Sequence, residues 1–245
     1  MPVLVLQGVR GGVGTSSLTA ALGWALQMLG ESTLAVDGCA DNMLRYFFND
    51  EIGRSAGWAR ALVDGTPWQD AGMRYTAHLD FLSYGALSAE ERQSLPALTS
   101  FPALVDALRQ KGGYRWVLVD LPCEPAPFML PVIEQCDLHF TVIHPDANAH
   151  IRLHQQRIPA QSRLLVNNLN TGSQLQEDIY QLWMKTQPRL LPLAVHRDEA
   201  MAECLAAKQP LGEYRFDALA AEEIVTLANW CLVHAADGSG AEAPR

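Results

Sequence analysis

The sequence lacks the excess of positive charge that nucleic-acid binding requires. Its 18 basic residues are outnumbered by 27 acidic residues, which gives a net charge of −9 over 245 residues. Neutralising a phosphate backbone takes clustered lysine and arginine side chains. We therefore expect no nucleic-acid partner, and a strong salt-dependent DNA shift would contradict this expectation.

The chain also lacks paired cysteines and long apolar segments. Its five cysteines, at positions 39, 123, 136, 204 and 231, form no CxxC pair, and an odd number does not suit a disulfide framework. No basic region precedes the short apolar stretch at the N-terminus, and no run approaches the roughly 18 apolar residues of a membrane span. We expect a protein of the reducing cytosol with no membrane anchor of its own.

Apolar residues are plentiful, at 49% of the chain, and can form a buried core. Short apolar runs typical of buried strands alternate with helical patterns. We expect strands at 3–6, 32–36, 79–82, 116–120, 138–143, 163–167 and 190–195, and helices at 16–29, 103–108, 176–183 and 218–232. This alternation predicts an α/β fold with a mainly parallel central sheet. We expect one domain over residues 1–234 and a flexible acidic tail over 235–245.

The most informative segment is the glycine-rich stretch Arg10–Ser17, between the first expected strand and the first expected helix. Gly11, Gly12 and Gly14 allow backbone N–H groups to close around phosphate oxygens, and the helix N-terminus attracts negative charge. The hydroxyl of Ser16 lies where such loops present a Mg²⁺ ligand. The stretch predicts a phosphate-binding loop, and a tight turn without a ligand is the simpler alternative.

The same glycines partly fit a dinucleotide-binding fingerprint. Gly12, Gly14 and Ser17 approximate the pattern G-x-G-x-x-G/A, and Asp37 ends the second strand, where an acid could bind a ribose. The pattern, however, has glycine or alanine at its third conserved position, and this chain has Ser17 there. Asp120, which ends a later strand, has no part in that fingerprint but does fit a nucleotide triphosphatase. A dinucleotide-dependent oxidoreductase is therefore one alternative.

Several segments together resemble the MinD/ParA ATPases, whose deviant Walker A loop reads K-G-G-x-G-K-[ST]-[ST]. The segments are the loop Arg10–Ser17, a switch I segment Ala35–Cys39, a Walker B and switch II segment Val117–Pro122, a strand end Leu165–Asn167 and a loop His196–Ala200. The resemblance implies a P-loop NTPase-like three-layer sandwich that binds ATP and Mg²⁺. It implies nucleotide contacts from Gly11, Gly12, Val13, Gly14, Thr15, Ser16, Ser17, Asn167 and Asp198, and Mg²⁺ held by Ser16, with Asp37 and Asp120 acting through water.

Longer phrases narrow the resemblance to one branch of that family. The stretches GVRGGVGTSS, WARALVDG, ANAHIRLHQQ, DIYQLW and HRDEAMAECLAAKQP are similar to the MinD-like proteins encoded with bacterial cellulose synthase, over roughly residues 1–233. This resemblance implies an ATP-sandwiched homodimer with Arg10 and Arg152 near the interface. It also implies a small dedicated companion protein, and recruitment through partners to the cellulose synthase complex at the inner membrane.

The sequence departs from the family at positions that serve hydrolysis. Thr15 replaces the P-loop lysine, Arg10 replaces the signature lysine that reaches across a dimer, and Cys39 replaces the switch I aspartate. Phosphoryl transfer is catalysed mainly by positioning and by neutralising developing charge, so these losses raise the barrier. We predict ATP binding with very slow or absent hydrolysis, and only Asp37 and Asp120 are candidates for catalysis. The alternative is an active ATPase that positions the cellulose machinery.

Three other features have simpler structural explanations. His150 and His154 have a spacing that suits zinc, but no third ligand is identifiable. Cys39 has no identifiable base beside it, which disfavours a nucleophilic or redox role. Most tryptophans and the amphipathic segment 176–183 should lie in the core, although tryptophans within 55–75 and 174–190 could instead form a groove for a partner.

Overall fold

A computed structural model describes residues 1–98 and 101–236 of the chain. Within these residues, eight strands form one sheet in the order β3-β4-β2-β5-β1-β6-β7-β8. The strands are β1 (Val3–Gly8), β2 (Thr33–Asp37), β3 (Met73–Arg74), β4 (Leu79–Leu82), β5 (Trp116–Leu121), β6 (Leu138–Ile143), β7 (Arg163–Leu169) and β8 (Leu190–His196). Neighbouring strands are parallel, except that β3 pairs antiparallel with β4 at one edge. The predicted α/β fold with a mainly parallel sheet is confirmed.

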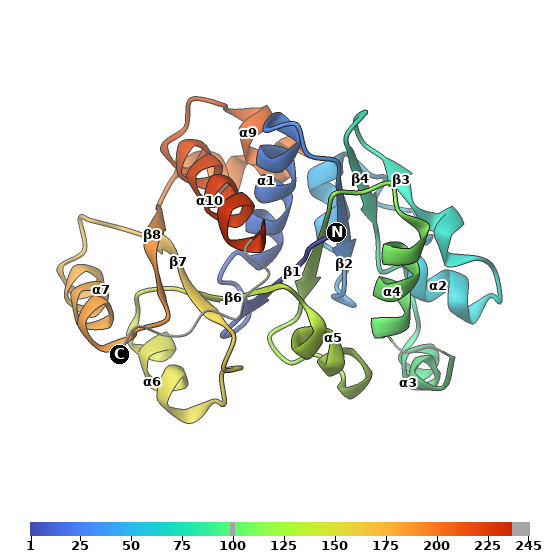
Figure 1. Cartoon of the computed structure of the whole chain (residues 1–245), viewed down its shortest axis with the longest axis horizontal. Coiled ribbons are helices and arrows are strands. Elements are labelled where there is room, and N and C mark those ends of the chain that lie inside the picture. Colours follow the sequence, from blue (N-terminus) through green and yellow to red (C-terminus); the bar gives the residue numbers. More distant parts are fainter. Residues whose placement is uncertain (99–100, 237–245) are drawn as a thin grey trace.

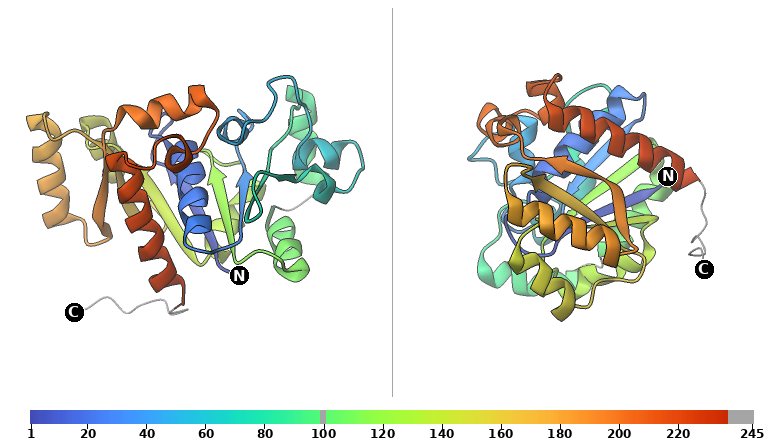
Figure 2. Two further views of the ribbon diagram at one scale, coloured as in Figure 1. Left: turned by 90° about the horizontal axis from the view of Figure 1, so that it is seen from above. Right: turned by 90° about the vertical axis from the view of Figure 1, so that its left-hand side faces the viewer.

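Helices cover both faces of the sheet (Figures 1 and 2). They are α1 (Thr15–Met28), α2 (Trp58–Val63), α3 (Ala89–Leu98), α4 (Phe101–Lys111), α5 (Leu130–Gln135), α6 (Ala147–Gln155), α7 (Gln174–Thr186), α8 (Glu199–Ala207), α9 (Leu211–Tyr214) and α10 (Leu219–Ala236), with short 3₁₀ helices η1 (Leu44–Phe48), η2 (Trp68–Ala71) and η3 (Pro127–Met129). One face packs against α1, α9 and α10, and the opposite face packs against α2, α4 and α5. The molecule is thus the expected three-layer sandwich.

The alternation of side chains along β1 explains its continuous apolar run. Val3 and Val5 belong to the core beneath α4 and α5, whereas Leu4 and Leu6 belong to the core beneath α1 and α10. All four side chains are fully buried. A central parallel strand is covered on both faces, so consecutive positions along it are apolar.

The order of the central strands distinguishes this sheet from the dinucleotide-binding fold. In that fold the first two strands are neighbours. Here β5 lies between β1 and β2 and pairs in parallel with both of them. The carboxyl ends of these three strands therefore meet at one edge of the sheet, with the end of β5 in the middle.

Two of the tryptophans that could have formed a groove for a partner are instead structural. Trp58 on α2 and Trp183 on α7 have no exposed surface, so the groove hypothesis is wrong for both. The helix predicted at 176–183 is confirmed as α7, which buries Ile179 and Trp183 against the sheet. Burying an indole removes a large apolar area from water, and this stabilises the fold.

The chain end is described only in part. Ala235 and Ala236 complete α10, and residues 237–245 of the expected tail lie outside the described residues. No described helix is both long and apolar enough to cross a membrane.

Replacing Trp58 with phenylalanine should destabilise the protein by about 2–3 kcal/mol. The indole Nε1 donates a hydrogen bond of 2.8 Å to the backbone carbonyl of Asp37, and Trp58→Phe leaves that buried oxygen without its donor. Urea denaturation measures the change. Trp68→Phe is the matched control, because the partly exposed Trp68 should tolerate the change. Equal losses in the two variants would contradict the role given to the Trp58 hydrogen bond.

Candidate nucleotide-binding site

The loop between β1 and α1 has the backbone conformation that its glycines suggested. Gly12 and Gly14 adopt positive φ angles of 75° and 88°, in the left-handed region that favours glycine. A Cβ added at Gly14 would lie 2.5 Å from the side-chain nitrogen of Asn167. That nitrogen donates a hydrogen bond of 2.8 Å to the carbonyl of Val13. Because Asn167 belongs to β7, this bond ties the loop to that strand.

The N-terminus of α1 opens onto this loop without a capping side chain. Gly14 is the N-cap residue, and the first turn of α1 contains no acidic residue. A Cβ at Gly11 would meet no atom within 4 Å, so packing within the chain does not explain the glycine there. Exposed N–H groups at a helix N-terminus, beside glycines that let a ligand approach closely, form an anion-binding site.

Two carboxylates lie side by side next to the loop. Asp37 is the last residue of β2, and Asp120, the last but one of the adjacent strand β5, is paired with it in register; both are fully buried. The Ser16 hydroxyl donates to Oδ2 of Asp120 at 2.5 Å. Oδ1 of Asp120 is buried and accepts no hydrogen bond from the described residues. The sequence predictions for Ser16, Asp37 and Asp120 therefore converge at one place in the structure.

Burial governs the protonation of this pair. Desolvation, and then the neighbouring charge of Asp120, raise the pKa of Asp37 well above its ordinary value. Desolvation raises the pKa of Asp120 to about 7, although the Ser16 hydrogen bond opposes the shift. A nearby cation would favour the ionised form of both groups.

The donor set fits Mg²⁺. Hard cations prefer carboxylate, hydroxyl and water oxygens, and Mg²⁺ in phosphate sites takes few protein ligands. Ser16, Asp37 and Asp120 supply such oxygens, and the buried Oδ1 of Asp120 needs a partner. The type and burial of these oxygen atoms therefore suit a Mg²⁺ ion.

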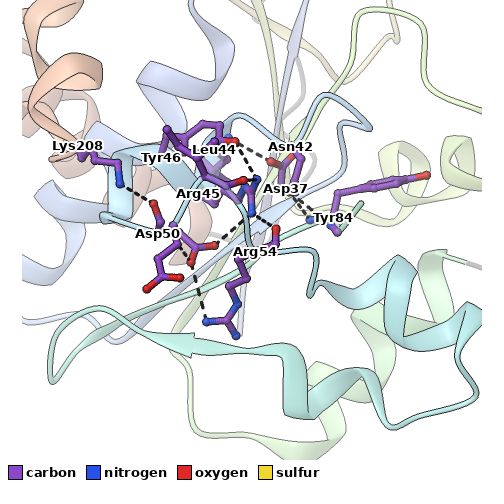
Figure 3. Close-up of polar contacts among 12 residues, drawn as sticks. Asp37, Asn42, Leu44, Arg45, Tyr46, Asp50, Arg54, Tyr84 and Lys208 are labelled. Carbon is purple, nitrogen blue, oxygen red and sulfur yellow. Dashed lines mark hydrogen bonds and ion pairs between the residues drawn. The ribbon is translucent and has the colours of Figure 1, made fainter. Parts of the chain in front are cut away.

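The segment after β2 fixes the position of Asp37 (Figure 3). The carboxylate accepts hydrogen bonds from the backbone N–H groups of Cys39 at 2.8 Å and Leu44 at 3.1 Å. Leu44 begins η1, and the next residue, Arg45, is buried and donates to the carbonyl of Ile52 at 3.1 Å. Asp37 is therefore both a ligand candidate and the acceptor that organises its own loop.

Cys39 lies beside the carboxylates, as its place in the switch I segment implied. Its sulfur is 3.9 Å from the backbone oxygen of Asp120. Burial, followed by the charges of Asp120 and Asp37, raises the pKa of the thiol far above its ordinary value. The thiol is therefore neutral at physiological pH, which disfavours the nucleophilic role and removes the negative charge that an aspartate would carry here.

The loop has no lysine, and its arginine has an internal partner. The three lysines of the chain, Lys111, Lys185 and Lys208, lie in or beside α4, α7 and α8. Arg10 donates to the carbonyl of Gly11 at 3.0 Å and forms an ion pair of 2.6 Å with Asp146. Arg10 is therefore turned toward the N-terminus of α6.

Three other predicted site residues have structural partners of their own. Asn167 is buried and donates to the loop carbonyl of Val13. The carboxylate of Asp198 accepts backbone hydrogen bonds from Ala200 and Ala220, at 3.0 and 3.2 Å. Arg152 donates to the Asn148 side chain at 2.8 Å. The nucleotide and interface roles of Asn167, Asp198 and Arg152 stay predictions.

The histidine pair forms no metal cluster. His150 Nδ1 accepts a hydrogen bond of 3.1 Å from the Trp183 indole, and its ring packs edge-on against His154. Among the described residues, the one group of three or more potential metal ligands comprises Asp37, Cys39 and Asp120.

Sequence reasoning missed Asp146. Its Oδ1 caps α6 by accepting from Ala149 N at 2.7 Å, while Oδ2 binds Arg10. The capping role was readable, because an aspartate directly precedes a helical stretch. The ion pair was not, since its partners lie 136 positions apart in the sequence.

The chain was compared with known proteins at the level of sequence. Residues 1–232 match the family model described as "Cellulose biosynthesis protein BcsQ". The chain is 54% identical to the proteins of that name from Salmonella typhimurium and from Escherichia coli K12, over 238 residues in each case. The matches cover 96% of this chain and 95% of each relative.

Solved structures with the same fold include proteins with a bound nucleotide. MinD from Pyrococcus horikoshii, solved with Mg-ADP, aligns with a TM-score of 0.73 at 18% identity, covering 98% of this chain and all of that one. A ParA family ATPase from Chlorobium tepidum gives 0.72 at 20% identity, covering 93% and 97%. Cobyrinic acid a,c-diamide synthase from Mycobacterium smegmatis, with bound ADP and magnesium, gives 0.75 at 16% identity, covering 100% and 99%. These likenesses confirm the P-loop NTPase fold.

Without divalent cations, Asp120→Asn should raise the free energy of unfolding above pH 7. The pKa of Asp120 is about 7 in the folded chain, against an ordinary value of 3.8. Between those values the folded chain holds a proton that the unfolded chain has lost, so stability falls as the pH rises through this window. The neutral asparagine avoids that loss, and the advantage of the variant should shrink toward the lower end of the window.

Urea denaturation in EDTA at pH 5 and pH 8 measures this difference. Asp106→Asn, which changes an exposed carboxylate on α4, is the control and should show no such trend. Added Mg²⁺ should stabilise the native chain and leave Asp120→Asn unchanged. A variant that is destabilised equally at both pH values would contradict the assignment.

Proposed function

The chain belongs to the family of the cellulose biosynthesis protein BcsQ, and from this premise we propose that it binds ATP with Mg²⁺ as an accessory subunit of the bacterial cellulose synthase and secretion complex. In this proposal ATP joins two copies of the chain into a homodimer that assembles or regulates the machinery. Hydrolysis is very slow or absent. The observation that carries the proposal is a glycine-rich loop without a lysine, at the uncapped N-terminus of α1 and next to a pair of buried carboxylates.

Binding is supported by groups that remain after the lysine is lost. The N–H groups of the loop, the dipole of α1 and the glycines at positions 11, 12 and 14 suit phosphate oxygens. Thr15, Ser16 and Ser17 open the first turn of α1 and bring their N–H groups to the same place. Ser16 would hold Mg²⁺, with Asp37 and Asp120 acting through water. Two proteins of the same fold were solved with ADP and magnesium bound, which supports the proposal of a nucleotide with Mg²⁺ for this chain.

Slow hydrolysis follows from two substitutions. Thr15 brings no cation to the γ-phosphate, and the neutral thiol of Cys39 can neither orient water as an ionised carboxylate would nor accept a proton readily. Removing one preorganised group typically costs about 3–4 kcal/mol of barrier lowering. The two losses need not add, because catalytic groups often act as a unit. ATP would then serve as a structural link or a slow switch.

In the proposed dimer, Arg10 supplies the positive charge for phosphate that Thr15 lacks. A guanidinium is always charged and can hold a phosphate through two hydrogen bonds. Arg10 occupies the position from which family members reach the partner's nucleotide. Arg152 lies on α6, and the N-cap residue of that helix, Asp146, forms the ion pair with Arg10. In a dimer Arg10 would exchange Asp146 for a phosphate of the partner's ATP.

The proposed partners follow from the family. They are a small companion protein (BcsR) and the synthase complex at the inner membrane. The chain itself would be cytoplasmic and would reach the membrane face through these partners. Direct nucleic-acid binding is not expected, given the net charge of −9.

Restoring the missing groups should restore hydrolysis. The double variant Thr15→Lys/Cys39→Asp is expected to raise the steady-state release of phosphate from Mg-ATP by about 100-fold or more. The matched control Thr15→Met/Cys39→Asn adds similar bulk without charge and should stay as slow as the native chain. Fast turnover by the native chain would instead favour an active ATPase that positions the cellulose machinery.

Freeing Arg10 should favour the dimer. Asp146→Asn keeps an oxygen to cap α6 but removes the ion pair with Arg10. Because a partly exposed pair contributes about 0.2–1 kcal/mol and the dimer gives up two such pairs, the ATP-dependent dimer should strengthen by up to about 30-fold. Sedimentation of the native and Asp146→Asn chains with Mg-ATP measures the shift, and Arg10→Ala should weaken the dimer. Unchanged dimerisation in both variants would remove Arg10 from the interface.

A further inference from the structure

We propose that Cys39, Asp37 and Asp120 form a binding site for a thiophilic divalent cation such as Zn²⁺. This inference rests on the proposed function in one respect: in that function the same two aspartates help to hold Mg²⁺. The cation would bind without nucleotide and would compete with Mg²⁺ for the same carboxylates.

The geometry of the three side chains carries the proposal. One ligand atom from each residue, the sulfur of Cys39 and a carboxylate oxygen from each aspartate, lies within 4.8 Å of the other two. The position of Asp37 is fixed by the N–H groups of Cys39 and Leu44. Ser16 fixes one oxygen of Asp120. Small rotations of these side chains would bring the three ligand atoms around one ion.

A second observation is the unsatisfied oxygen of Asp120. This residue has no exposed surface, and its Oδ1 accepts no hydrogen bond from the described residues. Leaving a buried carboxylate oxygen without a partner is unfavourable, and coordination of a cation removes that cost. The neighbouring like charge of Asp37 adds to the attraction for a divalent ion.

The sulfur sets the choice of ion. Thiolate ligands favour Zn²⁺ and other soft cations, whereas Mg²⁺ prefers oxygen alone. Three protein ligands with one open position are also the arrangement of many zinc sites. When the ion binds, the Cys39 thiol loses its proton to solvent and the sulfur forms the bond to the metal, so charge and atoms balance. An aspartate at position 39 would lack this selectivity.

The test uses the full chain, free of tag and nucleotide, titrated with Co²⁺ as a spectroscopic substitute for Zn²⁺. We expect one bound ion per chain, an intense thiolate-to-cobalt charge-transfer band in the near ultraviolet, and loss of that band when Zn²⁺ is added. Histidine or carboxylate binding elsewhere gives no such band. A native chain without the band would overturn the proposal.

Variants test whether the sulfur ligand comes from Cys39 and an oxygen ligand from Asp120. Cys39→Ser should abolish the band, and Asp120→Asn should weaken Co²⁺ binding by about tenfold or more. Cys123→Ser and Cys136→Ser, which change the other cysteines that are not fully buried, are the controls and should keep the band. A band that survives Cys39→Ser and disappears in Cys123→Ser would overturn the assignment.

Nucleotide binding separates this proposal from the proposed function. Mg-ATP binding is measured on the same native chain by calorimetry. Mg-ATP binding without a thiolate–cobalt band defeats only the zinc proposal, and the band without Mg-ATP binding defeats only the proposed function. If both bind, added Zn²⁺ should weaken Mg-ATP binding in the native chain but not in Cys39→Ser, and equal weakening in both would contradict a shared site.

Discussion

Two carboxylates held side by side in the protein interior are the constraint around which this site is built. Asp37 and Asp120 lie at the carboxyl ends of adjacent parallel strands at the same level, so their charges are brought together by the register of the sheet. Neither side chain has exposed surface, and the repulsion between their ionised forms is therefore poorly screened. The Trp58 indole, the N–H groups of Cys39 and Leu44, and the Ser16 hydroxyl hold this pair in place. A bound cation would offset this repulsion and favour the ionised form of both groups.

In the proposed function, binding and hydrolysis depend on different groups. The groups proposed to hold a phosphate are backbone N–H groups, and these remain where Thr15 stands in place of the family's lysine. The groups that speed phosphoryl transfer are charged side chains, and positions 15 and 39 no longer supply them. The account therefore describes a nucleotide site that keeps its shape while losing most of its catalytic charge.

The strands, the main helices and the loop were predictable from sequence because each depends on local pattern. Continuous apolar runs marked β1 and β5, and the glycines marked the loop before α1. Strand β3 was not predictable, since two residues carry no periodic signal. The internal partners of Arg10 and Asn167 depend on which distant segments the sheet brings together, which no local pattern encodes. The tryptophans of α2 and α7 could be recognised as large and apolar, but only the packed structure places them inside.

The most direct test of a nucleotide site that binds but does not turn over is the identity of the nucleotide that the native chain carries. The purified protein would be denatured, and the released small molecules separated by chromatography. The account predicts ATP in an amount close to that of the chain, with little ADP. Mainly ADP would mean that another residue supplies the missing charge, and a dinucleotide, or no nucleotide even after incubation with Mg-ATP, would contradict the central claim.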